Sequence, residues 1–381
     1  MKIPFNKPFT IGAELENIAA AVRDGHLAGD GRFTRQCHQW LEQNLGAKRA
    51  LLTHSCTAAL EMAAILCDLK PGDEVIMPSF TFVSTANAFA LRGATPVFVD
   101  IRPDTLNLDE KRIAQALTPR TRAIAPVHYA GVACEMDAIM ALARERGLLV
   151  VEDAAQGILA EYKGRKLGAI GHLGCLSFHE TKNVISGEGG ALLVNDEKLV
   201  ARAEIIREKG TNRAQFFRGE VDKYSWVDIG SSYLPSELVG AFLWAQLEQA
   251  RTINARRMDL CATYRKGLEP LAHGGALALP QPLPAGVAGN GHMFYVLLPE
   301  LATRTRLIAH LKARGIHSVF HYVPLHSSPA GRKFGRAAGP LTVTEGVSDR
   351  LLRLPLYYGL TEGEAAGIVA AIAEFFGGKP G

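Results

Sequence analysis

The sequence predicts an α/β protein with a mainly parallel, partly mixed sheet, followed by a smaller α+β domain. Short apolar runs alternate with amphipathic helical segments, which is typical of a parallel sheet covered by helices on both faces. The length of 381 residues is too great for one small core and fits a large domain plus a small one. We therefore expect a large domain over residues 1–245 and a small domain over 246–381.

The large domain is expected to begin with two helices and continue with alternating strands and helices. The first helices, 14–24 and 33–44, are joined by a glycine-rich turn at 29–31. Strands are expected over 50–53, 74–77, 95–99, 123–127, 148–151, 175–178 and 190–194. Helices are expected over 57–67, 83–91, 109–117, 135–146 and 196–209. The last two strands have no helical length between them, so some mixing of strand direction is expected.

The small domain is expected to follow a helical segment, whole or broken, over 236–270. Its predicted strands are 293–298 and 316–320, and its predicted helices are 303–313 and 362–376. Residues 211–235, 273–292 and 326–345 are expected to be rich in loops, and long loops often form lids or subunit contacts.

The composition excludes several classes of protein. Hydrophobic residues make up 48% and charged residues 21% of the chain, so it can bury a core and is not disordered. The 42 basic and 38 acidic residues are well mixed, so no nucleic-acid partner is expected. No apolar stretch approaches the ~20 residues of a membrane span, and no apolar signal core opens the chain, so no membrane partner is expected. The six cysteines form no C-x-x-C pair, which favours reduced thiols in a cytoplasmic protein.

Several common ligand-binding motifs are missing. No G-x-G-x-x-G follows a strand, and the chain has no P-loop and no G-x-S-x-G elbow. No cluster has zinc spacing, and the five-residue spacing of His321 and His326 fits no common metal site, so no metal is expected. The sequence therefore gives no support for a nicotinamide-dependent enzyme, a P-loop protein or a serine hydrolase.

An acidic residue at the end of a predicted strand is the first candidate for catalysis. The segment 150–156 is an apolar strand that ends in Glu152 and Asp153 and is followed by small residues. Ligands of open α/β sheets collect at the carboxyl ends of strands. A carboxylate there can face the protonated nitrogen of a pyridine ring and keep the ring cationic, as pyridoxal chemistry requires. The alternative is an ordinary helix N-cap, a position that Asp favours.

The second candidate is Lys182, in the turn that follows the predicted strand 175–178. A lysine in an enclosed site can lose its proton and attack an aldehyde, although most lysines are solvated surface groups. The glycine-rich segment 187–190 after it allows close approach of the backbone to a ligand. Lys182 follows Asp153 by 29 residues.

The third motif is the segment 54–60, where a strand ends and a helix begins with small and hydroxyl residues. Free N–H groups and hydroxyls at a helix start suit a phosphate. An ordinary Ser or Thr N-cap is the alternative.

These motifs, in this order, resemble those of the DegT/StrS-type sugar aminotransferases. The similar segments are 55–60, 78–82, 152–156, 177–183, 187–190, 321–326 and 354–357. The resemblance covers nearly the whole chain. It implies the PLP-dependent transferase fold, which is aspartate-aminotransferase-like (fold type I), and pyridoxal 5′-phosphate as the cofactor.

The resemblance also implies roles around the cofactor ring. Lys182 would hold the cofactor as a Schiff base and move the proton, and Asp153 would pair with the ring nitrogen. Gln156 would bond the ring hydroxyl, and Phe82 would stack on the ring face. A core aromatic is the alternative for Phe82.

Roles toward the phosphate and the substrate follow in the same way. Thr57, the backbone of Ala58 and Ser177 would hold the phosphate. The resemblance places one further segment at the sugar-nucleotide pocket, and it contains His321, Tyr322 and His326. The alternative is that the two histidines lie in a loop and bind no ligand.

The implied reaction is transfer of the amino group of L-glutamate to C4 of dTDP-4-dehydro-6-deoxy-D-glucose. The stretch 230–237 is similar to the branch that makes dTDP-4-amino-4,6-dideoxy-D-galactose for enterobacterial common antigen. The resemblance further implies a homodimer or a dimer of dimers, with a contact across the interface to the phosphate. Many relatives carry Asn at Ser232 and Arg at Leu234, so that contact differs here. A GDP- or UDP-keto-sugar aminotransferase and a non-catalytic regulatory relative are the alternatives.

Overall fold

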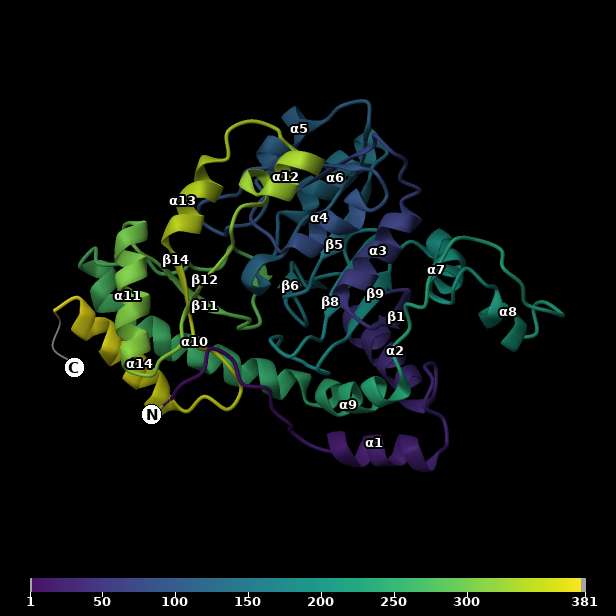
Figure 1. Cartoon of the computed structure of the whole chain (residues 1–381), viewed down its shortest axis with the longest axis horizontal. Helices are drawn as coiled ribbons and strands as arrows, with labels where there is room; N and C mark the ends of the chain where they lie inside the picture. The colour runs from purple at the N-terminus through teal and green to yellow at the C-terminus, as the bar shows by residue number, and fades with distance from the viewer. Residues whose placement is uncertain (1, 378–381) are drawn as a thin grey trace.

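The computed structural model describes residues 2–377 and is built around one large sheet (Figure 1). The sheet has eight strands, in the order β1-β9-β8-β5-β4-β2-β3-β13. β9 is antiparallel to both of its neighbours, and the other adjacent pairs are parallel. The expected mixture of strand directions is therefore confirmed. The strand bounds are β1 (Arg49–Thr53), β2 (Glu74–Pro78), β3 (Thr95–Val99), β4 (Thr121–Ile124), β5 (Leu149–Asp153), β8 (Leu173–Ser177), β9 (Gly190–Val194) and β13 (Arg336–Ala337).

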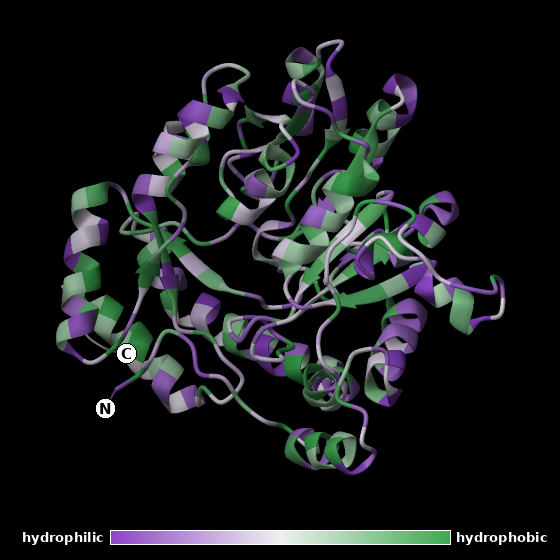
Figure 2. Ribbon diagram, turned by 45° about the vertical axis from the view of Figure 1, so that its right-hand side comes forward, coloured by the Kyte–Doolittle hydropathy of each residue, from purple (hydrophilic) through white to green (hydrophobic). Residues whose placement is uncertain are grey.

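Both faces of this sheet are buried. Along β1 the side chains of Ala50 and Leu52 join one hydrophobic core, and that of Leu51 joins another, as the two-residue period of a strand requires. Figure 2 shows the strands as mostly hydrophobic ribbons between helices of mixed character. The helices that follow the strands are α3 (Cys56–Leu66), α4 (Val83–Ala90), α5 (Ile113–Ala116), α6 (Met136–Arg146) and α7 (Val200–Arg207).

A second, three-stranded sheet has the order β11-β14-β12 and is antiparallel. It has a separate hydrophobic core, which includes Leu260, Tyr264 and Ile368 from the helices packed against it. The expected long helix is broken at Gln249 into α9 (Glu237–Glu248) and α10 (Ala250–His273). The other elements here are β11 (Phe294–Leu297), β12 (Val319–Phe320), β14 (Leu351–Leu354), α11 (Leu301–Ala313), α13 (Thr342–Arg350) and α14 (Glu362–Phe375). The division at residues 245 and 246 stays a prediction.

Several local predictions were wrong. The segment 326–345, expected to be rich in loops, contains α12 (Pro329–Phe334), the start of α13, and β13, which extends the large sheet beside β3. A two-residue strand is too short to show a period in the sequence. The predicted helix 109–117 is a 3₁₀ turn followed by the single turn of α5, and the predicted strand 316–320 forms β12 only at its end. The elements missed elsewhere are α8 (Arg213–Phe217), β6 (Glu161–Tyr162), β7 (Arg165–Lys166) and β10 (Val287–Ala288).

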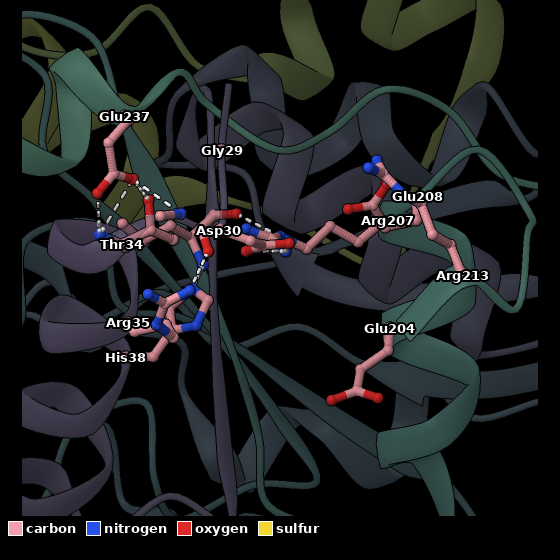
Figure 3. A network of polar contacts seen from close by, with 12 residues as sticks. Gly29, Asp30, Thr34, Arg35, His38, Glu204, Arg207, Glu208, Arg213 and Glu237 are labelled. Atoms are coloured by element: carbon pink, nitrogen blue, oxygen red, sulfur yellow. Dashed lines mark hydrogen bonds and ion pairs between the residues drawn. The ribbon is translucent and has the colours of Figure 1, made fainter. Parts of the chain in front are cut away.

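The N-terminal helix α1 (Glu14–Arg23) is tied to α9 by Gln246, whose Nε2 donates to the Glu14 carboxylate at 2.7 Å. Helix α2 (Arg32–Leu45) is tied to α9 through Glu237, a buried residue (Figure 3). Its carboxylate accepts hydrogen bonds from the backbone N–H of Gly31 at 3.1 Å and the hydroxyl of Thr34 at 2.6 Å. The N-cap of α2 is Gly31, which has no side chain, so the carboxylate of another helix takes over the capping function. Nearby, Nη1 of Arg207 contacts both carboxylate oxygens of Asp30 at 2.8 and 3.0 Å.

Candidate active site

A cavity of about 540 Å³ opens at the carboxyl ends of β5 and β8, beside the first turn of α3. This is the edge of a parallel sheet at which ligands usually bind. Most of the residues singled out in the sequence line this one cavity, namely Thr57, Phe82, Asp153, Gln156, Ser177, Lys182, His321 and Tyr322. Ala58 and His326 do not line it.

Lys182 lies in the turn between β8 and β9, where its backbone N–H bonds the carbonyl of His179 at 2.9 Å. Burial lowers the pKa of the Lys182 amine, and the nearby Arg353 cation adds to that effect against the opposing charge of Asp153. A lowered pKa increases the fraction of neutral amine at a given pH, and the neutral amine is the form that attacks an aldehyde.

Asp153 is the last residue of β5, and its carboxylate is held from two sides. Oδ2 accepts a hydrogen bond from the hydroxyl of Thr85 at 2.6 Å, and Oδ1 accepts one from the backbone N–H of Ala155 at 3.1 Å. The hydroxyl of Thr81 lies 2.9 Å from that of Thr85 and extends the chain of hydrogen bonds. These contacts fix the direction of the carboxylate, which a plain helix cap would not require.

The first turn of α3 supplies N–H groups and hydroxyls to the same cavity. Cys56 and Thr57 line it, and as the first residues of the helix they have no intrahelical carbonyl for their N–H groups. The Thr57 hydroxyl lies 2.7 Å from that of Ser84. The N–H of Ala58 is bonded to the N-cap hydroxyl of Ser55 at 3.1 Å, so this predicted contact is already used within the protein.

A glycine on β9 makes this arrangement possible. A Cβ atom on Gly190 would lie 2.4 Å from the carbonyl carbon of Ser55, far inside van der Waals contact. Any larger residue would displace the turn that starts α3. The glycine-rich segment after Lys182 thus allows close approach of the backbone to the first turn of the helix.

Aromatic and amide groups close the other side of the cavity. Nε2 of Gln156 donates to the Tyr322 hydroxyl at 3.2 Å, while its Oε1 accepts from the N–H of Ala130 at 2.6 Å. Burial, together with the nearby Arg353 and Lys182 cations, lowers the pKa of His321, which favours its neutral form. Phe82 is 58% exposed, so it is not the core aromatic that the sequence left open.

His326 is directed away from the cavity lining. Its Nδ1 lies 2.8 Å from the hydroxyl of Ser79, and its Nε2 lies 3.2 Å from a carboxylate oxygen of Glu345. These contacts attach the 3₁₀ turn Leu325–Ser327 to the end of β2 and to α13. Within residues 2–377 no group of three or more His, Cys, Asp or Glu side chains is arranged to hold a metal ion.

Two residues of the site were missed in the sequence. Thr85 lies inside α4. Its position in the sequence looks like that of any threonine buried in a helix. Arg353 lines the cavity from β14, and its signal was a single charge in the apolar run Leu351–Leu354. That signal predicts a special environment but not which site it faces.

The groups present fit pyridoxal phosphate. A lysine amine of lowered pKa, a carboxylate of fixed direction and the start of a helix all line one cavity. These are the groups that the aldehyde, the ring nitrogen and the phosphate of this cofactor require.

Comparisons with known proteins agree with this chemistry. The model of the DegT/DnrJ/EryC1/StrS aminotransferase family matches residues 10–373. GDP-perosamine synthase of Caulobacter vibrioides is 33% identical, over 97% of this chain and 97% of its own. The spore coat polysaccharide biosynthesis protein SpsC of Bacillus subtilis is 31% identical, over 99% of this chain and 97% of its own.

Solved structures are similar over the same length. The aminotransferase TlmJ from Streptoalloteichus hindustanus superposes with a TM-score of 0.91 at 29% identity, over 99% of both chains. The putative sugar aminotransferase Spr1654 from Streptococcus pneumoniae, in its PLP form, gives 0.90 at 25% identity over 98% of both chains. Aminotransferases of this family use pyridoxal phosphate. The expected fold and the expectation of an enzyme are thus confirmed, and the chain belongs to the DegT/DnrJ/EryC1/StrS aminotransferase family.

Proposed function

We propose that this aminotransferase uses pyridoxal phosphate bound to Lys182 to move the amino group of L-glutamate to a keto carbon of a nucleotide sugar. The observation that carries the proposal is the position of Lys182 and Asp153 in one cavity with the start of α3. When bound, the cofactor supplies an electron sink for the carbon that carries the amino group.

Each residue of the cavity has its own role in this reaction. The Lys182 amine holds the cofactor and then carries a proton to or from the substrate carbon. The Asp153 carboxylate would keep the ring nitrogen protonated, and Gln156 would bond the ring hydroxyl. Thr57 and Ser177 would receive the phosphate, with Phe82 over the ring.

The acceptor of the amino group is a specific keto sugar in this proposal. We assign C4 of dTDP-4-dehydro-6-deoxy-D-glucose as the acceptor, giving dTDP-4-amino-4,6-dideoxy-D-galactose for a cell-surface glycan such as enterobacterial common antigen. The resemblance of residues 230–237 to that branch supports it, and the name of SpsC refers to another cell-surface polysaccharide. His321 and Tyr322, at the edge of the cavity, would face the sugar.

A GDP-linked keto sugar is the second candidate, favoured by the 33% identity to GDP-perosamine synthase. The test is a panel of 4-keto-6-deoxy sugars linked to dTDP, GDP and UDP, each offered with L-glutamate. The highest kcat/KM with the dTDP sugar would support the first assignment, and with the GDP sugar the second. Absence of turnover with all three would support a non-catalytic relative.

We further propose a homodimer, with residues 211–235 at the interface. This segment projects from the body of the molecule around α8 (Figure 1). It exposes large apolar side chains, including Trp226 at 80% and Phe217 at 68%. Exposed apolar groups gathered in this way mark association surfaces.

We also propose that the enzyme works in the cytoplasm. All six cysteines are unpaired thiols, which supports work in the reducing cytoplasm. No helix within residues 2–377 combines the length and the apolar character needed to cross a membrane.

A further inference from the structure

Arg353 is a cation without an anionic partner in the cavity that Lys182 lines. It extends from β14, and its guanidinium lies over the ring of Phe5, with 4.6 Å from Cζ to the ring centroid. Its Nε is shielded from solvent and unbonded. Among residues 2–377, no carboxylate forms an ion pair with its guanidinium, and its side chain forms no hydrogen bond.

Arg353 is half-buried, and its lack of a polar partner contrasts with the buried arginines of the chain. Arg207 pairs with Asp30, and Arg257 donates to the carbonyls of Gly291 and His292. Burial lowers the pKa of Arg353, yet a guanidinium stays charged at physiological pH. Of its guanidinium nitrogens only Nε is both shielded from solvent and unbonded, so the two Nη groups keep access to solvent in a site where a ligand can reach them. A partly buried charge without a counter-ion is still costly, and folded proteins normally keep one where a ligand or partner completes it.

The side chains around Arg353 leave its cation available to an anionic ligand in this cavity. Arg353 is the one arginine among the residues that line this cavity in the described part of the chain. Burial and nearby cations lower the pKa of His292 and His321, so these neighbours favour their neutral forms and do not compete for an anion. The acids that line the same cavity are Asp153, which is held by Thr85 and Ala155, and Glu188, which is exposed.

We propose that Arg353 binds the α-carboxylate of the amino-acid donor. The inference rests on the proposed function, because it assumes an amino acid as the donor. In an amino acid, the carboxylate is attached to the same carbon as the reacting amino group, so its binding site must lie beside Lys182. In a 4-keto sugar nucleotide, the diphosphate is attached across the sugar ring from C4 and therefore lies farther out. A planar guanidinium can hold a carboxylate through two parallel hydrogen bonds.

The two half-reactions separate this role from a merely structural one. Only the donor half-reaction brings a carboxylate to the carbon that reacts. Removal of Arg353 should therefore weaken the donor and spare the sugar. It should also spare 4-aminobutanoate, which is L-glutamate without its α-carboxylate.

The experiment compares holoenzyme carrying Arg353→Gln or Arg353→Lys with a matched control, Arg350→Gln. Arg350 lies three residues earlier, donates to the carbonyl of Gly346 and does not line the cavity. Calorimetry with 2-methyl-L-glutamate, which has no α-proton to lose, measures binding without turnover. Single-turnover spectra measure the reactions with L-glutamate, 4-aminobutanoate and the 4-amino sugar nucleotide.

We expect Arg353→Gln to raise the Kd of 2-methyl-L-glutamate about 100-fold, because a charge-assisted pair is lost. Arg353→Lys should raise it about 10-fold, since the charge remains but the two-pronged geometry does not. The rates with 4-aminobutanoate and the amino sugar should change less than about threefold in both variants, and Arg350→Gln should match wild type.

An unchanged Kd in folded Arg353→Gln would overturn the proposal, and so would an equal loss in both half-reactions. A loss confined to the sugar nucleotide would assign Arg353 to its diphosphate instead and also overturn it. If Arg353→Gln does not fold, Arg353→Lys decides the question by the same measurements. If wild-type enzyme transfers no amino group from L-glutamate to any keto sugar, the proposed function fails, and the calorimetric Kd still tests the carboxylate site.

Discussion

The hydroxyl of Thr85 donates a hydrogen bond to Oδ2 of Asp153 over 2.6 Å, so a helix residue orients a carboxylate at the end of a strand. The two residues are 68 positions apart. Because Thr85 donates to Asp153, the Thr81 hydroxyl, 2.9 Å away, must donate to Thr85. The direction of the Asp153 carboxylate thus depends on a chain of two hydroxyls, one just before α4 and one in its first turn.

Thr85→Val removes the donor while keeping the shape of the side chain. A hydrogen bond to a charged group contributes ~1.5–3 kcal/mol, so we expect kcat to fall by about tenfold or more as Asp153 loses its fixed direction. Thr81→Val, one step farther away, is the control and should have a smaller effect. Wild-type kcat in a folded Thr85→Val variant would mean that the bond to Ala155 alone positions the carboxylate.

Asp153→Asn tests the role of the carboxylate itself. The neutral amide cannot stabilise a protonated ring nitrogen, so the electron sink is weakened although the cofactor still binds. Loss of one preorganised electrostatic partner typically costs ~10²–10³ in rate. Steady-state kcat and cofactor content measured together would check this. An unchanged kcat at full cofactor occupancy would make Asp153 only a structural residue.

Lys182 should be the site of covalent attachment. The purified protein should be yellow, and borohydride should bleach it and leave reduced cofactor on the peptide that contains Lys182. Lys182→Ala should still bind pyridoxal phosphate without a covalent bond, since Thr57, Asp153 and Phe82 remain. Its turnover should fall by at least ~10²–10⁴, the usual cost of losing a general base. Label on another lysine, or steady turnover by Lys182→Ala without added amine, would contradict the assignment.

The buried amine should also affect the stability of the apoenzyme in a pH-dependent way. The folded pKa of Lys182 lies below its ordinary value of 10.5, so protonation opposes folding at lower pH. We therefore expect apo Lys182→Met to melt at a higher temperature than apo wild type at pH 7. The difference should shrink as the pH rises from the lowered folded pKa toward 10.5. Lys70→Met, at an exposed lysine outside the cavity, serves as the control. A gain in Tm that persists unchanged at high pH would point to packing by methionine rather than to charge.

The proposed dimer predicts a change of mass on substitution in the projecting segment. Trp226→Ser with Phe217→Ser should shift the enzyme from dimer to monomer at micromolar concentration and lower its activity, as measured by sedimentation and kcat. Leu301→Ser, at a leucine that is 45% exposed on α11, is the control and should stay dimeric. A wild-type monomer with full activity would contradict the dimer proposal.

Local patterns in the sequence were enough to predict much of the molecule. Apolar runs and amphipathic periods located the main strands and helices because burial on one or two faces imposes those periods. Asp153 was recognisable because it ends an apolar strand, and Lys182 because it lies in the turn after one. Parallel strand ends meet at one edge of a sheet. The missing helix between 175–178 and 190–194 correctly indicated mixed strand directions.

The tertiary structure decided what depends on contacts between distant segments. β13 joins the large sheet by pairing Arg336 with Val97, and nothing in two residues of sequence encodes that partner. The bond from Thr85 to Asp153 exists only because α4 packs beside the end of β5. The charge of Arg353 is visible in its strand, but its lack of a partner is a property of everything that surrounds it, including Phe5 from the other end of the chain. A sequence specifies which groups must be buried, whereas only packing determines which of them are left for a ligand to complete.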